Sequence, residues 1–154
     1  MFSKEELKQY KIDFWTAFKK RMQDKRSSNG RKINWLNYPS EIPYIFIRLD
    51  ATAKEARFMI DIQPKDDGIR AIIWEQLYEL KVVFEAEMGT DGQWLENESN
   101  QQVAAFNRIC WMLEDVNFFQ EKDKQTIFDF FEERLVKFDN FYQEFKDILI
   151  HLAS

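Results

Sequence analysis

DKQTIFDFFEERLVKFDNFYQEFKDILIHL, residues 123–152, is the most strongly patterned part of this chain. Two series of large apolar residues, each spaced by seven, run through it three positions apart. On a helix these series form one continuous apolar seam. The pattern predicts a long amphipathic helix whose seam holds Phe128, Leu135, Tyr142 and Leu149 in one series, Phe131, Phe138, Phe145 and Leu152 in the other, and Ile127, Phe141 and Ile148 at its side.

A helix of this length also predicts self-association. From Asp123 to Leu152 it spans about 45 Å at 1.5 Å per residue, whereas a domain of this size has a radius of gyration of about 15 Å. We expect the seam to extend beyond the chain's own core, where exposed phenylalanines need a partner, most simply in a twofold homodimer. The predicted interaction residues are Phe128, Phe131, Phe138, Phe141, Phe145 and Leu149.

The alternative is a helix that breaks near Asp139–Asn140 and folds back on itself. Asn140 with Gln143 fits the start of a second helix, because Asn caps helix N-termini and Gln can complete the cap from three positions on. A broken helix leaves the chain monomeric.

Upstream, two segments with alternating apolar residues predict a β-hairpin. Residues 44–51 and 56–63 alternate with period two and are joined by residues 52–55. Burial requires the two apolar faces to coincide, which sets a register in which paired residue numbers sum to 107. In this register Asp50 faces Arg57, and Asp61 faces Phe46.

The other elements complete an α+β domain over residues 1–154, in the order α-β-β-β-α-β-β-α. The sheet is expected to be mainly antiparallel and packed by helices. Ser3 and Glu6 fit a capping box at the start of the first helix, and Gly89 fits a helix C-terminus. The expected segments are a helix to Asp24, a strand at 33–38, the hairpin, a helix at 68–88, strands at 93–96 and 103–113, and the C-terminal helix.

Composition places the protein in the cytoplasm. Cys110 is the one cysteine, so no internal disulfide can form and a secreted disulfide framework is excluded. The N-terminus does not resemble a signal peptide, and no apolar run approaches the length of a membrane span. We therefore expect no membrane partner.

Charge is distributed unevenly. Residues 1–32 carry a formal charge of +6. Because the net charge of the chain is −5, residues 33–154 carry −11. Three interpretations remain open: nucleic-acid binding that weakens with salt, docking of the basic segment on acidic parts of the chain or of a partner, and a solvated helix face. The residues predicted to contact nucleic acid are Lys25, Arg26, Arg31 and Lys32.

Several segments resemble an uncharacterised bacterial family of the "domain of unknown function" type. They are SKEEL at 3–7 followed by Phe14-Trp15, INWLNY at 33–38, the hairpin, residues 75–89 ending in FEAEMG, Trp94, Arg108-Ile109 and the Phe-rich final helix. The resemblance implies a domain found alone or attached to nuclease-like domains, in an accessory role near DNA processing.

The order of elements also resembles the core of the PD-(D/E)xK nucleases, which bind Mg²⁺ through strand carboxylates. Asp50, Asp61 and Gln63 are the candidate site residues, with Gln63 where those enzymes carry lysine. The hairpin register separates Asp50 and Asp61 by about 13 Å along the strands, too far for two ligands of one Mg²⁺ at about 2.1 Å. The sequence thus predicts no metal, no cofactor and a non-catalytic, self-associating protein-interaction module, with a nucleic-acid-binding domain or a degenerate nuclease as alternatives.

Overall fold

The computed structural model describes residues 2–153 and has an α+β fold. Its elements follow one another as α1 (Lys4–Met22), a 3-10 turn η1 (Trp35–Asn37), β1 (Ile45–Ala51), β2 (Glu55–Ile62), α2 (Asp67–Glu79), α3 (Lys81–Met88), β3 (Gln93–Glu98), β4 (Phe106–Glu114), η2 (Glu121–Asp123) and α4 (Lys124–Ala153).

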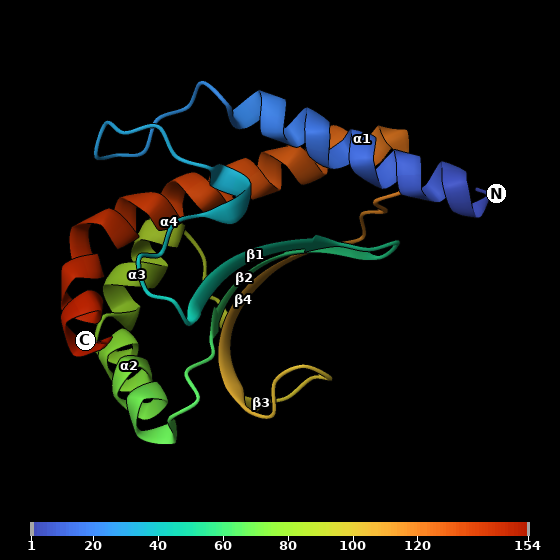
Figure 1. The fold of residues 1–154 in the computed structure, drawn as a ribbon. Helices are drawn as coiled ribbons and strands as arrows, with labels where there is room; N and C mark the ends of the chain where they lie inside the picture. Colours follow the sequence, from blue (N-terminus) through green and yellow to red (C-terminus); the bar gives the residue numbers. More distant parts are fainter. Residues whose placement is uncertain (1, 154) are drawn as a thin grey trace.

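The four strands form one antiparallel sheet in the order β1-β2-β4-β3. The sheet is strongly curved, and the helices lie on its convex side (Figure 1). Helix α4 arcs along that side, with α1 beside its first half and α2 and α3 beside its second half. No helix or strand of the described residues 2–153 covers the concave side.

The predicted hairpin register is confirmed. Ile45 pairs with Ile62, Asp50 with Arg57 and Phe46 with Asp61. The capping box is confirmed as well: the Glu6 N–H donates to the Ser3 hydroxyl, and the Ser3 N–H donates to the Glu6 carboxylate.

Two predicted elements were wrong, which changes the order to α-β-β-α-α-β-β-α. Residues 33–38 are not a strand, because the Asn34 side chain accepts hydrogen bonds from the Leu36 and Asn37 N–H groups and turns the chain into η1. The single helix expected over residues 68–88 is two helices that meet at Leu80, whose φ of −92° and ψ of 0° end α2.

The predicted long C-terminal helix is confirmed: it is continuous from Lys124 to Ala153, and the alternative, a break at Asp139–Asn140, is absent. Its aromatic seam packs on the convex face of the sheet. Phe138, for example, contacts the rings of Phe58 and Phe84. This packing makes one core shared by the sheet and all four α-helices.

Candidate functional site

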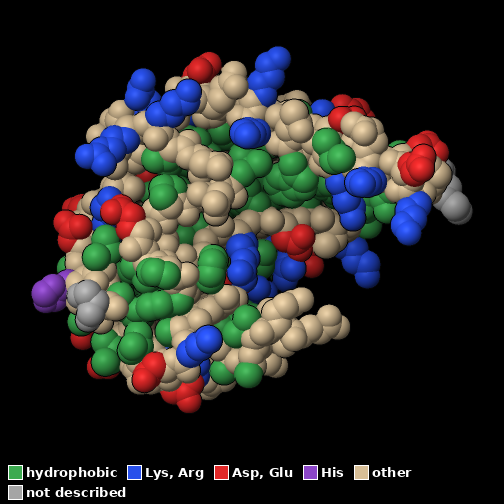
Figure 2. Space-filling view, viewed as in Figure 1, with side chains coloured by type: hydrophobic (Ala, Val, Ile, Leu, Met, Phe, Trp, Pro, Cys, Tyr) green, Lys and Arg blue, Asp and Glu red, His purple; other side chains and the backbone are tan. Residues whose placement is uncertain are grey.

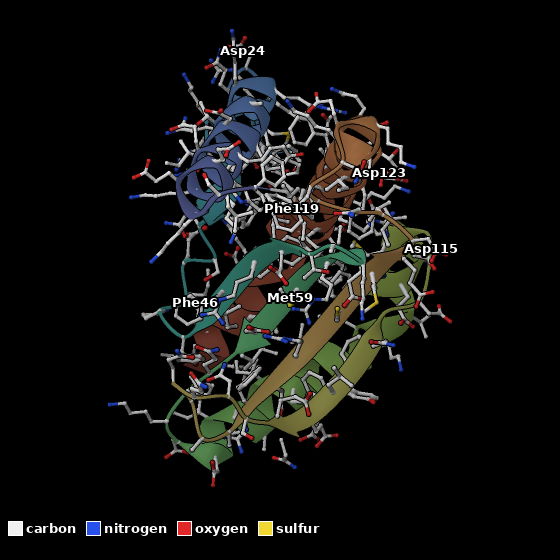
Figure 3. All side chains as sticks on the ribbon, turned by 90° about the vertical axis from the view of Figure 1, so that its right-hand side faces the viewer. Asp24, Phe46, Met59, Asp115, Phe119 and Asp123 are labelled. Carbon is white, nitrogen blue, oxygen red and sulfur yellow. The ribbon has the colours of Figure 1, made fainter. Side chains whose placement is uncertain are left out.

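The concave face of the sheet is a surface that no helix or strand of residues 2–153 covers. Because side chains alternate along strands, the confirmed register places a mixed set of residues there. Figure 3 looks onto this face, with Phe46 on β1 and Met59 on β2 labelled. The face includes Phe46, Arg48 and Asp50 on β1, Arg57, Met59 and Asp61 on β2, and Phe106, Arg108, Cys110 and Met112 on β4.

Asp61 lies at the centre of this face and is fully buried. Arg108, directly opposite it on β4, donates from Nε to Oδ1 at 2.6 Å and from Nη2 to Oδ2 at 2.9 Å. Arg48 on β1 donates from Nη1 to Oδ2 at 2.6 Å. These charge-assisted bonds offset the cost of burying the carboxylate, and the hydrogen bonds to Asp61 raise the pKa of Arg108 against the opposing effect of burial.

The two candidate nuclease carboxylates, Asp50 and Asp61, are therefore engaged in ion pairs. Asp50 accepts from Arg57 Nη2 at 2.7 Å, and both oxygens of Asp61 are taken by arginines. Gln63 follows β2, and its buried Nε2 has no hydrogen-bond partner among residues 2–153. In the same described part of the chain, no three His, Cys, Asp or Glu side chains gather closely enough to hold a metal ion.

The floor of the concave face is closed although no helix or strand in the described part of the chain covers it. Met59, Phe106 and Cys110 are each less than 5% exposed. Arg108 lies over the Phe106 ring at 5.1 Å, and burial raises the pKa of the Cys110 thiol. Phe46 is 39% exposed under Arg48, so the surface alternates aromatic and guanidinium groups.

The outer edge of β1 borders a groove. A space of about 600 Å³ lies between this strand and the segment that contains η1, lined by Leu36, Tyr38 and Pro43 on one side and by residues 45–50 on the other. In Figure 2, apolar side chains gather in the hollow between α1 and the sheet.

The predicted nucleic-acid residues lie elsewhere, on the loop after α1. A bridge between Arg26 and Lys32 closes this loop, and Arg26, Arg31 and Lys32 are exposed. Lys32 also lines a groove of about 420 Å³ with Lys19 at the end of α1. Figure 2 shows Lys and Arg side chains along this upper surface.

Part of the basic segment docks on acidic residues of the same chain. Arg21 pairs with Asp129 at 2.6 Å and with Glu132 at 2.7 Å, and Lys25 pairs with Glu132 at 3.4 Å. Lys25 is thereby separated in role from Arg26, Arg31 and Lys32, for which no ion pair is found within residues 2–153.

Residues 10–146 match the family described as "Domain of unknown function (DUF4268)". The chain belongs to the DUF4268 family. No curated protein and no solved structure matches it.

In this DUF4268 domain the aromatic seam of α4 is covered from within the chain. Phe131 and Phe138 are at most 2% exposed, and Phe145 is half-buried. Apart from its C-terminal end, where Ile148 is 43% and Leu152 is 37% exposed, the seam is covered, and its phenylalanines do not form the exposed surface from which a partner was predicted. The buried members of the predicted interaction set are Phe128, Phe131, Phe138, Phe141 and Leu149.

One buried polar site of this domain was not identified from the sequence. Asp139 on α4 is 1% exposed and accepts hydrogen bonds from the Ser27 hydroxyl (2.7 Å), the Ser28 N–H (2.7 Å) and the Tyr38 hydroxyl (2.6 Å). Burial and this carboxylate raise the pKa of Tyr38. The spacing carried this signal, because Asp139 lies four residues after Leu135 and three before Tyr142 and therefore shares the apolar face of the helix.

Within residues 2–153, no helix combines the length and the apolar character that crossing a bilayer requires.

Proposed function

We propose that this DUF4268 domain is a non-catalytic protein–protein interaction module that self-associates. The observation that carries the proposal is the one-sided packing of the sheet: helices bury the convex face, while the concave face and the β1 edge stay open. The aromatic seam of α4 does not contribute, since the core covers it.

The chemistry of the open surface supports a protein partner. Arginine, aromatic residues and methionine are enriched where proteins meet, and the concave face presents all three, with Phe46 39% and Met112 37% exposed. Its three arginines are balanced in large part by Asp50 and Asp61. A surface of nearly balanced charge with apolar groups suits another protein surface better than a polyanion.

The proposal involves no cofactor and places the domain in the cytoplasm, where a single cysteine such as Cys110 stays reduced. The geometry around Asp61 does not favour a degenerate nuclease. A metal ion at Asp61 would have to displace Arg48 and Arg108 from both carboxylate oxygens.

Light scattering across a concentration series tests the proposal. Between about 1 and 200 µM, a range centred on the micromolar affinities of transient complexes, the mass should rise from 18.7 kDa toward twice that value. A constant mass of one chain at the highest concentration would contradict self-association.

Nucleic-acid binding through the basic loop is the second candidate. The specific observation is the groove between Lys19 and Lys32, with Arg26 on the neighbouring strand of the loop. Phosphate contacts of this kind weaken steeply with salt.

The test is binding to a DNA oligonucleotide at 50 and 200 mM salt, with Arg26→Glu and Arg31→Glu combined. The matched control reverses two exposed lysines away from the loop, Lys65→Glu with Lys122→Glu. Loss of affinity in the loop variant alone supports this function. Equal affinities in both variants, or none at low salt, ends it.

A further inference from the structure

The outer edge of β1 has backbone groups without partners. In an antiparallel ladder, residues alternate between those whose N–H and C=O face the paired strand and those whose groups face away. The Thr52 N–H donates to the Glu55 carbonyl, and the Gln63 N–H donates to the Tyr44 carbonyl. The backbone N–H and C=O groups of the even-numbered residues of β1 therefore point toward β2. Those of Ile45, Ile47, Leu49 and Ala51 point away from it, toward the open edge.

Within residues 2–153, Ile45 is the only one of these outward positions whose backbone N–H and C=O groups have hydrogen-bond partners. The Ile45 N–H donates to the Ile42 carbonyl, and the Ile45 carbonyl accepts from the Ser40 hydroxyl. For Ile47, Leu49 and Ala51, no hydrogen bond outside the β1–β2 ladder is found in the described range. A row of such groups is a template for a further strand.

The groove beside the edge gives a further strand room and an apolar floor. Its volume of about 600 Å³ lies directly against residues 45–50. Leu36 and Leu49, on its two sides, are half-buried and join the core. A strand laid here would cover these side chains on one face and extend the concave surface on the other.

Charge selects which strand fits. Arg48 and Asp50 flank Leu49 and are 39% and 42% exposed. If β1 of a second copy runs antiparallel with Leu49 facing Leu49, each Arg48 faces the other copy's Asp50. A shift of two residues in one direction sets Arg48 against Arg48, and in the other Asp50 against Asp50, and like charges directly opposite are destabilising.

Both charged side chains have capacity for this second contact. Arg48 donates to Asp61 through Nη1 alone, which leaves Nε and Nη2. Asp50 accepts from Arg57 through Oδ2, which leaves Oδ1. The new pairs would therefore form without breaking the contacts that hold the concave face.

We propose that two copies pair antiparallel through β1, centred on Leu49, and join their four-stranded sheets into one. This inference rests on the proposed self-association and names its surface. Each copy contributes the outward backbone groups of Ile47, Leu49 and Ala51 and one Arg48–Asp50 contact.

Cross-linking tests the register directly. Residues facing each other in a hydrogen-bonded pair lie about 5.5 Å apart between Cα atoms, within the range of a disulfide. Under mild oxidation the full-length Leu49→Cys variant should form a covalent dimer at least tenfold faster than Glu96→Cys, the matched change on the other edge strand, β3. Cys110 is buried and does not compete.

Charge variants test the contact without a new thiol. Asp50→Lys should weaken the dimer at least tenfold, whereas Glu96→Lys, with the same change in charge on β3, should not. Mixing Asp50→Lys with Arg48→Glu should restore a heterodimer, because each Arg48–Asp50 contact then again joins opposite charges. If the Arg48→Glu variant does not fold, because its new carboxylate would lie beside Asp61, the comparison of Asp50→Lys with Glu96→Lys still tests the Arg48–Asp50 contact.

The outcomes separate the two proposals. Dimerisation by light scattering, with Leu49→Cys no faster than Glu96→Cys and Asp50→Lys no weaker than Glu96→Lys, overturns the β1 edge and leaves self-association standing. A protein that stays monomeric at every concentration overturns both self-association and β1 pairing. Both are overturned even if the β1 edge then binds an unrelated peptide strand.

Discussion

The two faces of one sheet are stabilised by different forces. The convex face carries Ile45, Phe58, Ile60 and Trp111 under the aromatic side of α4. The concave face, built from the intervening residues of the same strands, holds a buried carboxylate under arginines. Apolar side chains must be covered by another layer to be buried. Ion pairs between neighbouring strands satisfy one another within the sheet, so the face above them can stay in contact with solvent or a partner. The contrast separates the part of the sheet that secures the fold from the part free to bind.

The largest expected effect is on the convex side. Phe138→Ala should lower the free energy of unfolding by about 3–5 kcal/mol, because it removes a fully buried ring that contacts Tyr38, Phe58 and Tyr142. Phe46→Ala on the concave face is the matched control and should cost less than about 1 kcal/mol. Urea unfolding measures both, and equal losses would break the distinction between the faces.

The second effect concerns the buried carboxylate of the concave face. Asp61→Asn should cost about 2–3 kcal/mol, because Arg48 and Arg108 lose their charged acceptor in a closed site. Asp50→Asn, at the exposed Arg57 pair, should cost less than about 1 kcal/mol. If the two variants unfold at the same urea concentration, Asp61 does not hold this face together.

A third test asks whether the floor of the open face is closed. Cys110 is 4% exposed and burial raises its pKa, so both access and thiolate population are low. Its alkylation at pH 8 should be about tenfold or more slower in the folded protein than in urea. Rapid labelling of the folded protein would show that the side chains over the floor open readily.

The smallest effect belongs to an exposed ion pair on the helix side. Burial acts to raise the pKa of Glu132, but Arg21 and Lys25 lower it overall. Its contribution is present above the unfolded pKa of about 4.3 and is lost as pH falls through the lower folded value. We expect less than about 1 kcal/mol.

Comparing wild type with Glu132→Gln in urea at pH 7 and pH 3 measures that contribution. The difference between the two proteins should shrink at the lower pH. A difference that grows toward acid would mean that the pair does not stabilise the fold.

Local patterns predicted much of this fold. The alternation in residues 44–63 set the hairpin register correctly, because only one register puts both apolar faces on the same side. The same register placed Asp61 opposite Phe46 but could not reveal Arg108, which reaches Asp61 from a strand paired to the other side of β2. Asp61 was thus weighed as a metal ligand, although the structure places it as the centre of an ion-pair cluster.

The sequence by itself determined the elements whose signals are local: the capped first helix, the hairpin and the long amphipathic helix. Each depends on residues within a few positions of one another, where periodicity and side-chain-to-backbone bonds act directly. Tertiary structure alone decided which surfaces are open. The α4 seam became core because α1, α2, α3 and the sheet close over it. The concave face stayed exposed because no helix or strand of residues 2–153 packs on it, and the β1 edge is bonded only at Ile45, by the segment that precedes the strand.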